Sequence, residues 1–128
     1  MRVLLVDNHQ LVRQVLARVL AAEPDIVVVG EGATGQEAID LARQLQPEVL
    51  LINVRLIGLS GVDATRAILT ECPGLCVVGM TLVDNPTEAQ AIREAGAAAC
   101  ISKSGPLEEL FAAIRACPRR PNALTATR

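Results

Sequence analysis

Six polar residues could form one chemical site, because each follows or ends a short apolar stretch. They are Asp7, Asn8, Glu31, Asn53, Thr81 and Lys103. Lys103 is the only lysine among twelve basic residues, and the other eleven are arginines. In a chain that otherwise uses arginine for positive charge, one compact and flexible ammonium indicates a specific role. We therefore expect Lys103 to lie in a pocket.

A second pattern points to different chemistry. Residues 30–35 read Gly-Glu-Gly-Ala-Thr-Gly, which matches the G-x-G-x-x-G fingerprint of dinucleotide-binding domains. In those domains the fingerprint belongs to the first strand-helix unit, and an acidic ribose ligand follows about twenty residues later. Here a strand and a helix come first, and Asn53 stands near the acidic position. A small nucleotide- or flavin-binding α/β protein is therefore the less favoured alternative.

The cysteines and the histidine do not form a metal-binding motif. Cys72, Cys76, Cys100 and Cys117 include no Cys-x-x-Cys pair, and His9 is the only histidine. Scattered cysteines of this kind are expected to be small residues of the core. A chain of 128 residues needs neither a disulfide nor a structural metal to fold.

Strand and helix patterns alternate five times along the chain. Helical spacing of apolar residues, capping-box spacing at residues 34–37 and an Asn85-Pro86 start mark the helices. The predicted strands cover residues 2–7, 26–30, 48–53, 75–81 and 98–102, and the predicted helices cover 11–20, 34–45, 62–71, 85–96 and 106–117. We predict a three-layer, doubly wound α/β domain with a five-stranded parallel sheet. Ligands bind beyond the carboxyl ends of such strands, where the six polar residues lie.

The composition excludes several functions. Hydrophobic residues make up 51%, charged residues 20%, and the net charge is -2, which argues against disorder and a polybasic nucleic-acid surface. With Phe111 as the only aromatic residue, there is no base-stacking platform. No apolar run is long enough for a membrane span or signal peptide. We expect a cytoplasmic protein without a membrane partner, which contacts DNA only through another domain.

Residues 2–117 resemble the receiver domain of bacterial two-component response regulators. The motifs that carry the resemblance are Val3-Leu4-Leu5-Val6-Asp7, Gly32-x-x-Gly35-x-Glu37-Ala38, Asn53-x-x-x-x-Gly58-x-x-Gly61, Thr81, and Ala95-Gly96-Ala97 before Lys103. Their order and spacing together are more specific than any one of them. The resemblance implies a flavodoxin-like fold with strand order 2-1-3-4-5.

The resemblance also implies phosphorylation of an aspartate, and this chain differs from the family at that position. A receiver accepts a phosphoryl group on an aspartate at the end of its third strand, with Mg²⁺ bridging carboxylate and phosphate. Asn53 occupies that position, and a carboxamide cannot form an acyl phosphate. The phosphate contacts would come from the Thr81 hydroxyl and the Lys103 ammonium. Without phosphate, we expect Lys103 to pair with Asp7.

The metal positions implied by the family are Asp7, Asn8, Asn53 and the backbone carbonyl of Arg55. Only one of the three side chains is a carboxylate, and Mg²⁺ depends on charged oxygen ligands. Mg²⁺ binding is therefore expected to be weak or absent, and no other cofactor is expected.

Two further positions depart from the family pattern. Ile57 stands where proline is common, and Cys100 stands at the position of the switch aromatic. These departures, with Asn8, favour natural divergence over an engineered exchange at Asn53 alone. The hypothesis is a non-enzymatic atypical receiver controlled by protein partners, by dimerisation through its first and last helices, or by another input. The alternative is a phosphorelay receiver inactivated only at position 53. Whether a histidine kinase is one of the partners is left undecided by the sequence.

The composition changes after Cys117. Pro118-Arg119-Arg120-Pro121-Asn122 has linker character. Residues 124–128, Leu-Thr-Ala-Thr-Arg, resemble the opening of the helix-turn-helix output domain that follows many receivers. We therefore predict a receiver-like domain over residues 1–117, then a linker and the possible start of a DNA-binding output domain that regulates transcription.

Overall fold

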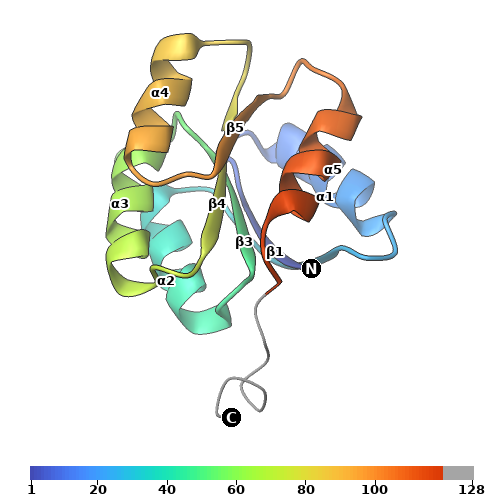
Figure 1. Cartoon of the computed structure of the whole chain (residues 1–128), viewed down its shortest axis with the longest axis horizontal. Helices are drawn as coiled ribbons and strands as arrows, with labels where there is room; N and C mark the ends of the chain where they lie inside the picture. Colours follow the sequence, from blue (N-terminus) through green and yellow to red (C-terminus); the bar gives the residue numbers. More distant parts are fainter. Residues whose placement is uncertain (120–128) are drawn as a thin grey trace.

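A computed structural model describes residues 1–119, in which strands and helices alternate strictly (Figure 1). The elements are β1 (Arg2–Val6), α1 (Gln10–Ala21), β2 (Val27–Gly32), α2 (Gly35–Leu45), β3 (Val49–Asn53), α3 (Gly61–Glu71), β4 (Cys76–Thr81), α4 (Pro86–Glu94), β5 (Ala99–Ser102) and α5 (Leu107–Ala116). The strands form one parallel sheet in the order β2-β1-β3-β4-β5. The predicted fold class and strand order are confirmed.

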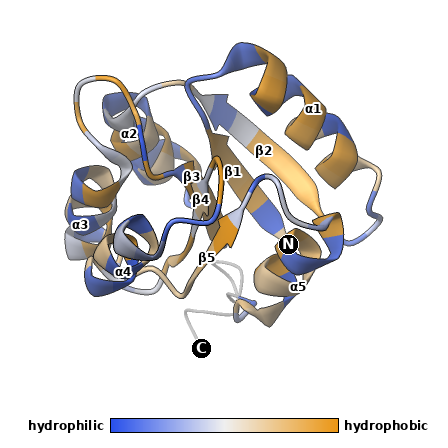
Figure 2. Cartoon of the chain, turned by 90° about the horizontal axis from the view of Figure 1, so that it is seen from above, coloured by the Kyte–Doolittle hydropathy of each residue, from blue (hydrophilic) through white to orange (hydrophobic). Residues whose placement is uncertain are grey.

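Helices cover both faces of the sheet. Figures 1 and 2 show α1 and α5 on one side and α2, α3 and α4 on the other. Side chains of β1 alternate between two cores, with Val3 and Leu5 packed against the α1–α5 layer and Leu4 and Val6 against the opposite layer. Every residue of β3 and β4 is buried. A strand covered on both faces is apolar throughout, which explains the uninterrupted runs in the sequence.

Side-chain caps begin three of the helices. At α2 the Thr34 hydroxyl accepts a hydrogen bond from the Glu37 N–H at 3.1 Å, and the Glu37 carboxylate accepts one from the Ala33 N–H at 3.3 Å. This reciprocal pair is the expected capping box. At α3 and α4 the side chains of Ser60 and Asn85 accept hydrogen bonds from the backbone N–H groups of Asp63 and Glu88. The second strand extends two residues beyond the predicted end, because Val6 of β1 still pairs with Gly32.

Cys76 and Cys117 are core residues, as expected of the scattered cysteines, but the expectation that they are free is wrong. Cys76 of β4 and Cys117 at the end of α5 form a disulfide, with their Cα atoms 5.9 Å apart. Both are buried in the core of the α1–α5 face. Cys72 and Cys100 are free and partly buried. Sequence reasoning missed the bond because only the docking of α5 brings together two positions 41 residues apart.

Two further predictions concern membrane spans and the segment after Cys117. In the described part, no helix combines the length and apolar character needed to cross a membrane. The predicted linker and output-domain start lie mostly outside the described residues. Only Pro118 and Arg119 are described there, and both are exposed without regular secondary structure.

Candidate functional site

A pocket lies at the carboxyl ends of the central strands. Its cavity has a volume of about 340 Å³ and is lined by Asn53, Thr81 and Lys103, with His9 and Glu88 among its other walls. The parallel register sets this convergence, because Asn53 pairs with Met80 and its neighbour Thr81 pairs with Ser102. Three of the six sequence-predicted residues thus share one cavity, as expected for a doubly wound sheet.

Asp7 and Lys103 form the expected ion pair beside this cavity. The Lys103 Nζ donates to Asp7 Oδ2 at 2.8 Å, and the two side chains are 6% and 0% exposed. The other carboxylate oxygen accepts the backbone N–H of His9 at 2.9 Å. The His9 ring is 58% exposed, with Nδ1 at 3.4 Å from the same oxygen. Both oxygens of Asp7 are therefore already engaged by donors of the protein.

Asn53 is buried, and its amide joins the residues around it. The Nδ2 group donates to the backbone carbonyl of Arg55 at 2.7 Å and to Asn8 Oδ1 at 3.2 Å. Both acceptors are oxygens that the family pattern assigns to metal binding. In this arrangement each of the two oxygens accepts a hydrogen bond from the Asn53 amide.

The donor set does not fit Mg²⁺. A hard divalent cation is held by several oxygens of which carboxylates supply the charge. Here the one carboxylate, Asp7, is neutralised by Lys103, and the Asn8 side-chain oxygen and the Arg55 carbonyl oxygen accept hydrogen bonds from Asn53. Among the described residues, no group of three or more His, Cys, Asp or Glu side chains could hold a metal ion.

Glu31 does not join the pocket. It lies on the edge strand β2, with β1 between it and the rest of the site. Its carboxylate is 3.3 Å from the Arg13 Nε, and the Arg13 Nη1 donates to the backbone oxygen of Asp7 at 2.7 Å. Arg13 thus links the rim of the pocket to the sheet edge, a role the sequence did not reveal.

One ion pair at the pocket was also not predicted. The Arg55 guanidinium, which follows β3, pairs with Glu88 in the first turn of α4. The hydrogen bond to Glu88 raises the pKa of Arg55. The family pattern assigns only the backbone of Arg55, so the two side chains, 33 residues apart, carried no sequence signal.

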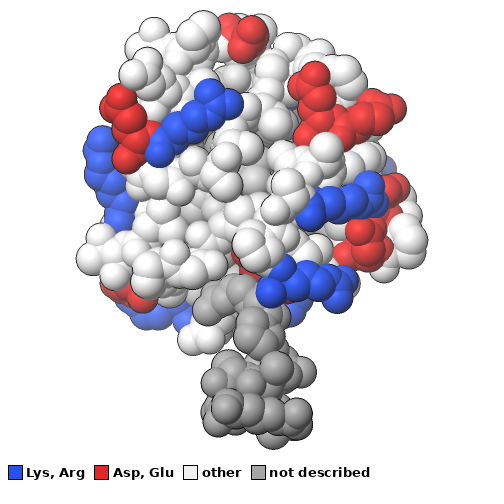
Figure 3. Space-filling view, viewed as in Figure 1, with Lys and Arg blue, Asp and Glu red and all other residues white. Residues whose placement is uncertain are grey.

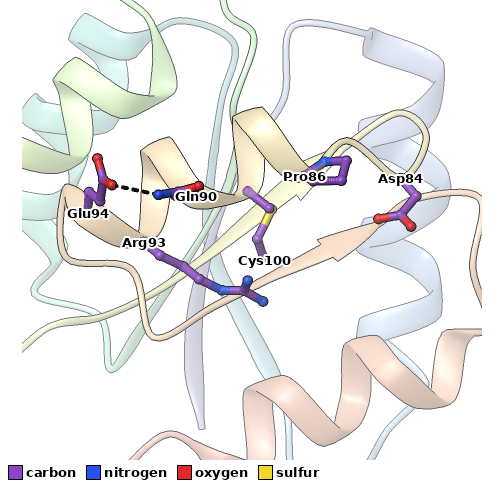
Figure 4. Close-up of a pocket in the computed structure, with 7 residues that line it drawn as sticks. Asp84, Pro86, Gln90, Arg93, Glu94 and Cys100 are labelled. Carbon is purple, nitrogen blue, oxygen red and sulfur yellow. Dashed lines mark hydrogen bonds between the residues drawn. The ribbon is translucent and has the colours of Figure 1, made fainter.

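A second hollow lies beside Cys100, the predicted equivalent of the switch aromatic. It has a volume of about 620 Å³ and runs between α4 and β5, lined by Asp84, Pro86, Gln90 and Arg93 among others. Figure 4 shows Cys100 on the strand facing Pro86, Gln90 and Arg93 of the helix, with Asp84 on the loop before it. Burial raises the pKa of the Cys100 thiol. Cys100 is thus one of the walls of the hollow.

Packing explains two of the three glycines of the dinucleotide-like pattern. A Cβ at Gly30 would lie 2.6 Å from a methyl of Leu45, and one at Gly35 would lie 2.6 Å from the backbone oxygen of Leu59. The pattern also starts on β2, an edge strand, and not on the central strand where a phosphate-binding turn is expected.

The sheet order and the polar residues at its carboxyl edge define a flavodoxin-like α/β domain of the receiver type. The chain belongs to the response regulator receiver domain family, whose sequence profile matches residues 3–115. It is 39% identical over 114 residues to the response regulator GacA of Pseudomonas aeruginosa, covering 89% of this chain and 53% of that protein. It is 36% identical over 118 residues to the transcriptional regulatory protein LiaR of Bacillus subtilis, covering 92% and 56%.

Solved structures agree with this assignment. The chain resembles a two-component response regulator of the LuxR family from Aurantimonas sp., with a TM-score of 0.85, 31% identity, and coverage of 99% of this chain and 86% of the other. It also resembles the signal receiver domain of the putative response regulator NarL from Mycobacterium tuberculosis, with a TM-score of 0.83, 27% identity, and coverage of 89% and 92%. The chain spans about half the length of the curated relatives it matches.

Proposed function

We propose that this receiver domain regulates transcription without using aspartyl phosphorylation. The observation that supports the proposal is the position of Asn53 at the end of β3 with its amide bonded to Asn8 and Arg55. Phosphoryl transfer to a receiver needs a carboxylate nucleophile there and a metal ion that neutralises the developing charge. A carboxamide supplies no nucleophile, and its N–H groups face the oxygens that the metal would need.

The proposed domain is a non-enzymatic module that acts in the bacterial cytoplasm through protein partners. Of the two phosphate-contacting residues that the family pattern implies, Lys103 already forms an ion pair with Asp7. A switch without phosphate needs a ligand or partner that binds its two states unequally. Mg²⁺ has no part in the proposed mechanism.

The proposed output is DNA binding by a domain outside the described residues. The match to LiaR, a transcriptional regulatory protein of about twice the matched length, supports this assignment. On the face drawn in Figure 3, basic and acidic side chains lie at the margins and no continuous basic surface is present. Phosphate contacts with DNA require such a surface.

Self-association is the proposed means of output control. Leu11 and Val15 on α1 are 77% and 59% exposed, and Leu107 at the start of α5 is 45% exposed. Leu16, Leu20, Leu110 and Ile114 on the same helices are buried against the sheet. The exposed apolar residues thus remain free for a second copy of the chain.

The test of lost phosphorylation is the variant Asn53→Asp. With Mg²⁺ and a small phosphodonor such as acetyl phosphate, intact-protein mass spectrometry should show no added phosphoryl group, because Asn8 still leaves the pocket one carboxylate short. Asn8→Asp combined with Asn53→Asp is the matched control that restores both. Phosphorylation of Asn53→Asp alone, with a change in sedimentation, would establish the alternative of a receiver inactivated only at position 53.

A further inference from the structure

The disulfide joins a fixed part of the fold to the end of a surface helix. Cys76 pairs with Val49 inside the sheet, and every residue of β4 is buried. Cys117 is the C-cap of α5, where the backbone leaves the helix at φ -68° and ψ 138°. The bond therefore ties the last turn of α5 to the sheet at the point from which the chain continues toward residue 118.

We propose that Cys76 and Cys117 form a reversible thiol–disulfide site whose co-substrate is a low-molecular-weight thiol, with its own disulfide as the oxidised form. The inference rests on the proposed function in one respect, because it names an input that replaces phosphate. Its chemistry depends only on the two cysteines.

The reaction is balanced by two molecules of the thiol. A first thiolate attacks one sulfur of the Cys76–Cys117 bond, which breaks, and the released cysteine thiolate takes a proton from water. A second thiolate attacks the low-molecular-weight sulfur of the mixed disulfide and releases the other cysteine. Two protein thiols and one small disulfide result. The reverse sequence reoxidises the protein.

Access to the bond depends on the last turn of α5. Cys76 is 9% exposed and Cys117 is 6% exposed, so the attacking thiol needs a local opening. Terminal helical turns open at a small fraction of the global cost. Besides the disulfide, this turn is held by the buried side chain of Ile114 and by Arg115, which forms ion pairs with Glu23 and Asp25. Arg115 is 43% exposed, and exposed ion pairs contribute little.

The two free cysteines are separated from this site by the sheet. Cys72 and Cys100 pack against the opposite core, whereas Cys76 and Cys117 belong to the core of the α1–α5 face. Direct exchange between the two pairs is therefore blocked in the folded domain. In the oxidised state the last turn of α5 is held on β4, and in the reduced state it is released.

Redox titration of the full chain tests the site directly. The protein is equilibrated in buffers of varied glutathione to glutathione disulfide ratio, quenched with acid, alkylated and mapped by mass spectrometry. The variant with Cys72→Ser and Cys100→Ser serves as the control that leaves one pair only. We expect both proteins to show the same reversible two-electron transition at Cys76–Cys117. A pair that stays reduced, or stays oxidised, at every ratio in the folded protein would overturn the proposal.

Hydrogen exchange tests the conformational consequence. On reduction, amides of residues 114–117 should exchange about tenfold faster or more, while amides of α2 and α3 stay within about twofold. Cys117→Ser should reproduce the reduced pattern, and reduction of the unmutated chain gives the same reading if that variant fails to fold. Equal exchange in both redox states would overturn the release of α5. Neither result depends on phosphorylation of Asn53→Asp, so failure of the proposed function is detected separately.

Discussion

The Lys103 ammonium lies 2.8 Å from the Asp7 carboxylate, and both side chains are almost wholly removed from solvent. A buried pair that loses one member leaves the other as an uncompensated charge. We predict that Asp7→Asn and Lys103→Met each lower the free energy of unfolding by about 3 kcal/mol or more. The double variant should recover part of that loss.

A double-mutant cycle measured by urea unfolding checks this prediction, because single substitutions mix lost attraction with stranded charge. Simple addition of the two losses would contradict the burial of the pair. Arg66→Gln breaks an exposed pair with Asp63 and is the control, with an expected effect of about 0–1 kcal/mol.

Because Asn53 carries an amide in place of a carboxylate, we predict that Mg²⁺ does not change the thermal stability of the protein. Millimolar Mg²⁺ should leave the melting temperature unchanged within about 1 °C, because no second carboxylate is available to the ion. In the variant with Asn8→Asp and Asn53→Asp, Mg²⁺ should raise the melting temperature by roughly 3 °C or more, as expected for binding to the folded state only. Differential scanning calorimetry measures the melting temperatures of both proteins, with and without Mg²⁺. A clear rise in the unmutated chain would show that Asp7 and backbone carbonyls suffice.

Only glycine at position 61 lets α3 begin this close to the end of β3, since a Cβ there would overlap the Asn53 carbonyl oxygen. Gly61→Ala must displace either α3 or the end of β3, and we expect a loss of about 2–4 kcal/mol in the free energy of unfolding. Gly74→Ala is the matched control, since a Cβ at that glycine meets nothing within 4 Å. Thermal unfolding of the two variants checks the difference, and equal stabilities would refute it.

Self-association through α1 and α5 is tested with Leu11→Glu. Leu11 is 77% exposed, and a carboxylate buried in an apolar interface should weaken a dimer by roughly tenfold or more. Ile57→Glu is the control, because Ile57 is 76% exposed but lies in the loop after β3. Sedimentation velocity at high micromolar concentration gives the readout. A monomeric unmutated protein, alone and as part of a longer regulator, would remove the dimer hypothesis.

The parts of the site that the sequence predicted are those that follow from strand geometry alone. Asp7, Asn53, Thr81 and Lys103 lie at strand ends, and parallel strands bring their carboxyl ends to one edge of the sheet. Glu31 obeys the same rule yet stands apart. Its strand is at the edge of the sheet, and Arg13 of α1 engages its carboxylate there.

The parts that the sequence did not predict depend on how helices dock. The Arg55–Glu88 pair needs the first turn of α4 to lie beside the loop after β3, and the Cys76–Cys117 bond needs the end of α5 to reach β4. Helix periodicity tells which side of a helix is buried but not where along a strand its end will lie. Such contacts therefore come from tertiary packing and leave no trace in local spacing.

The contact between Arg115 and Asp25 predicts a specific acid sensitivity. The Arg115 guanidinium donates two hydrogen bonds to the carboxylate, at 2.9 Å each, and lowers the pKa of Asp25 to about 2 from an ordinary value near 3.8. A carboxylate with a lowered pKa in the folded state stabilises the fold above its unfolded pKa, and this contribution disappears as pH falls through the folded value. Arg115→Gln should therefore be less stable than the unmutated chain from pH 7 to about pH 4, and the difference should shrink between about pH 4 and pH 2.

Urea unfolding across this pH range measures the difference in the free energy of unfolding. Both proteins are kept in the same cysteine redox state, because Arg115 and Cys117 hold the same helical turn. A stability difference that stays constant down to pH 2 would show that Arg115 acts through its packing on Phe111, whose ring centroid is 5.5 Å away, and not through the charge of Asp25.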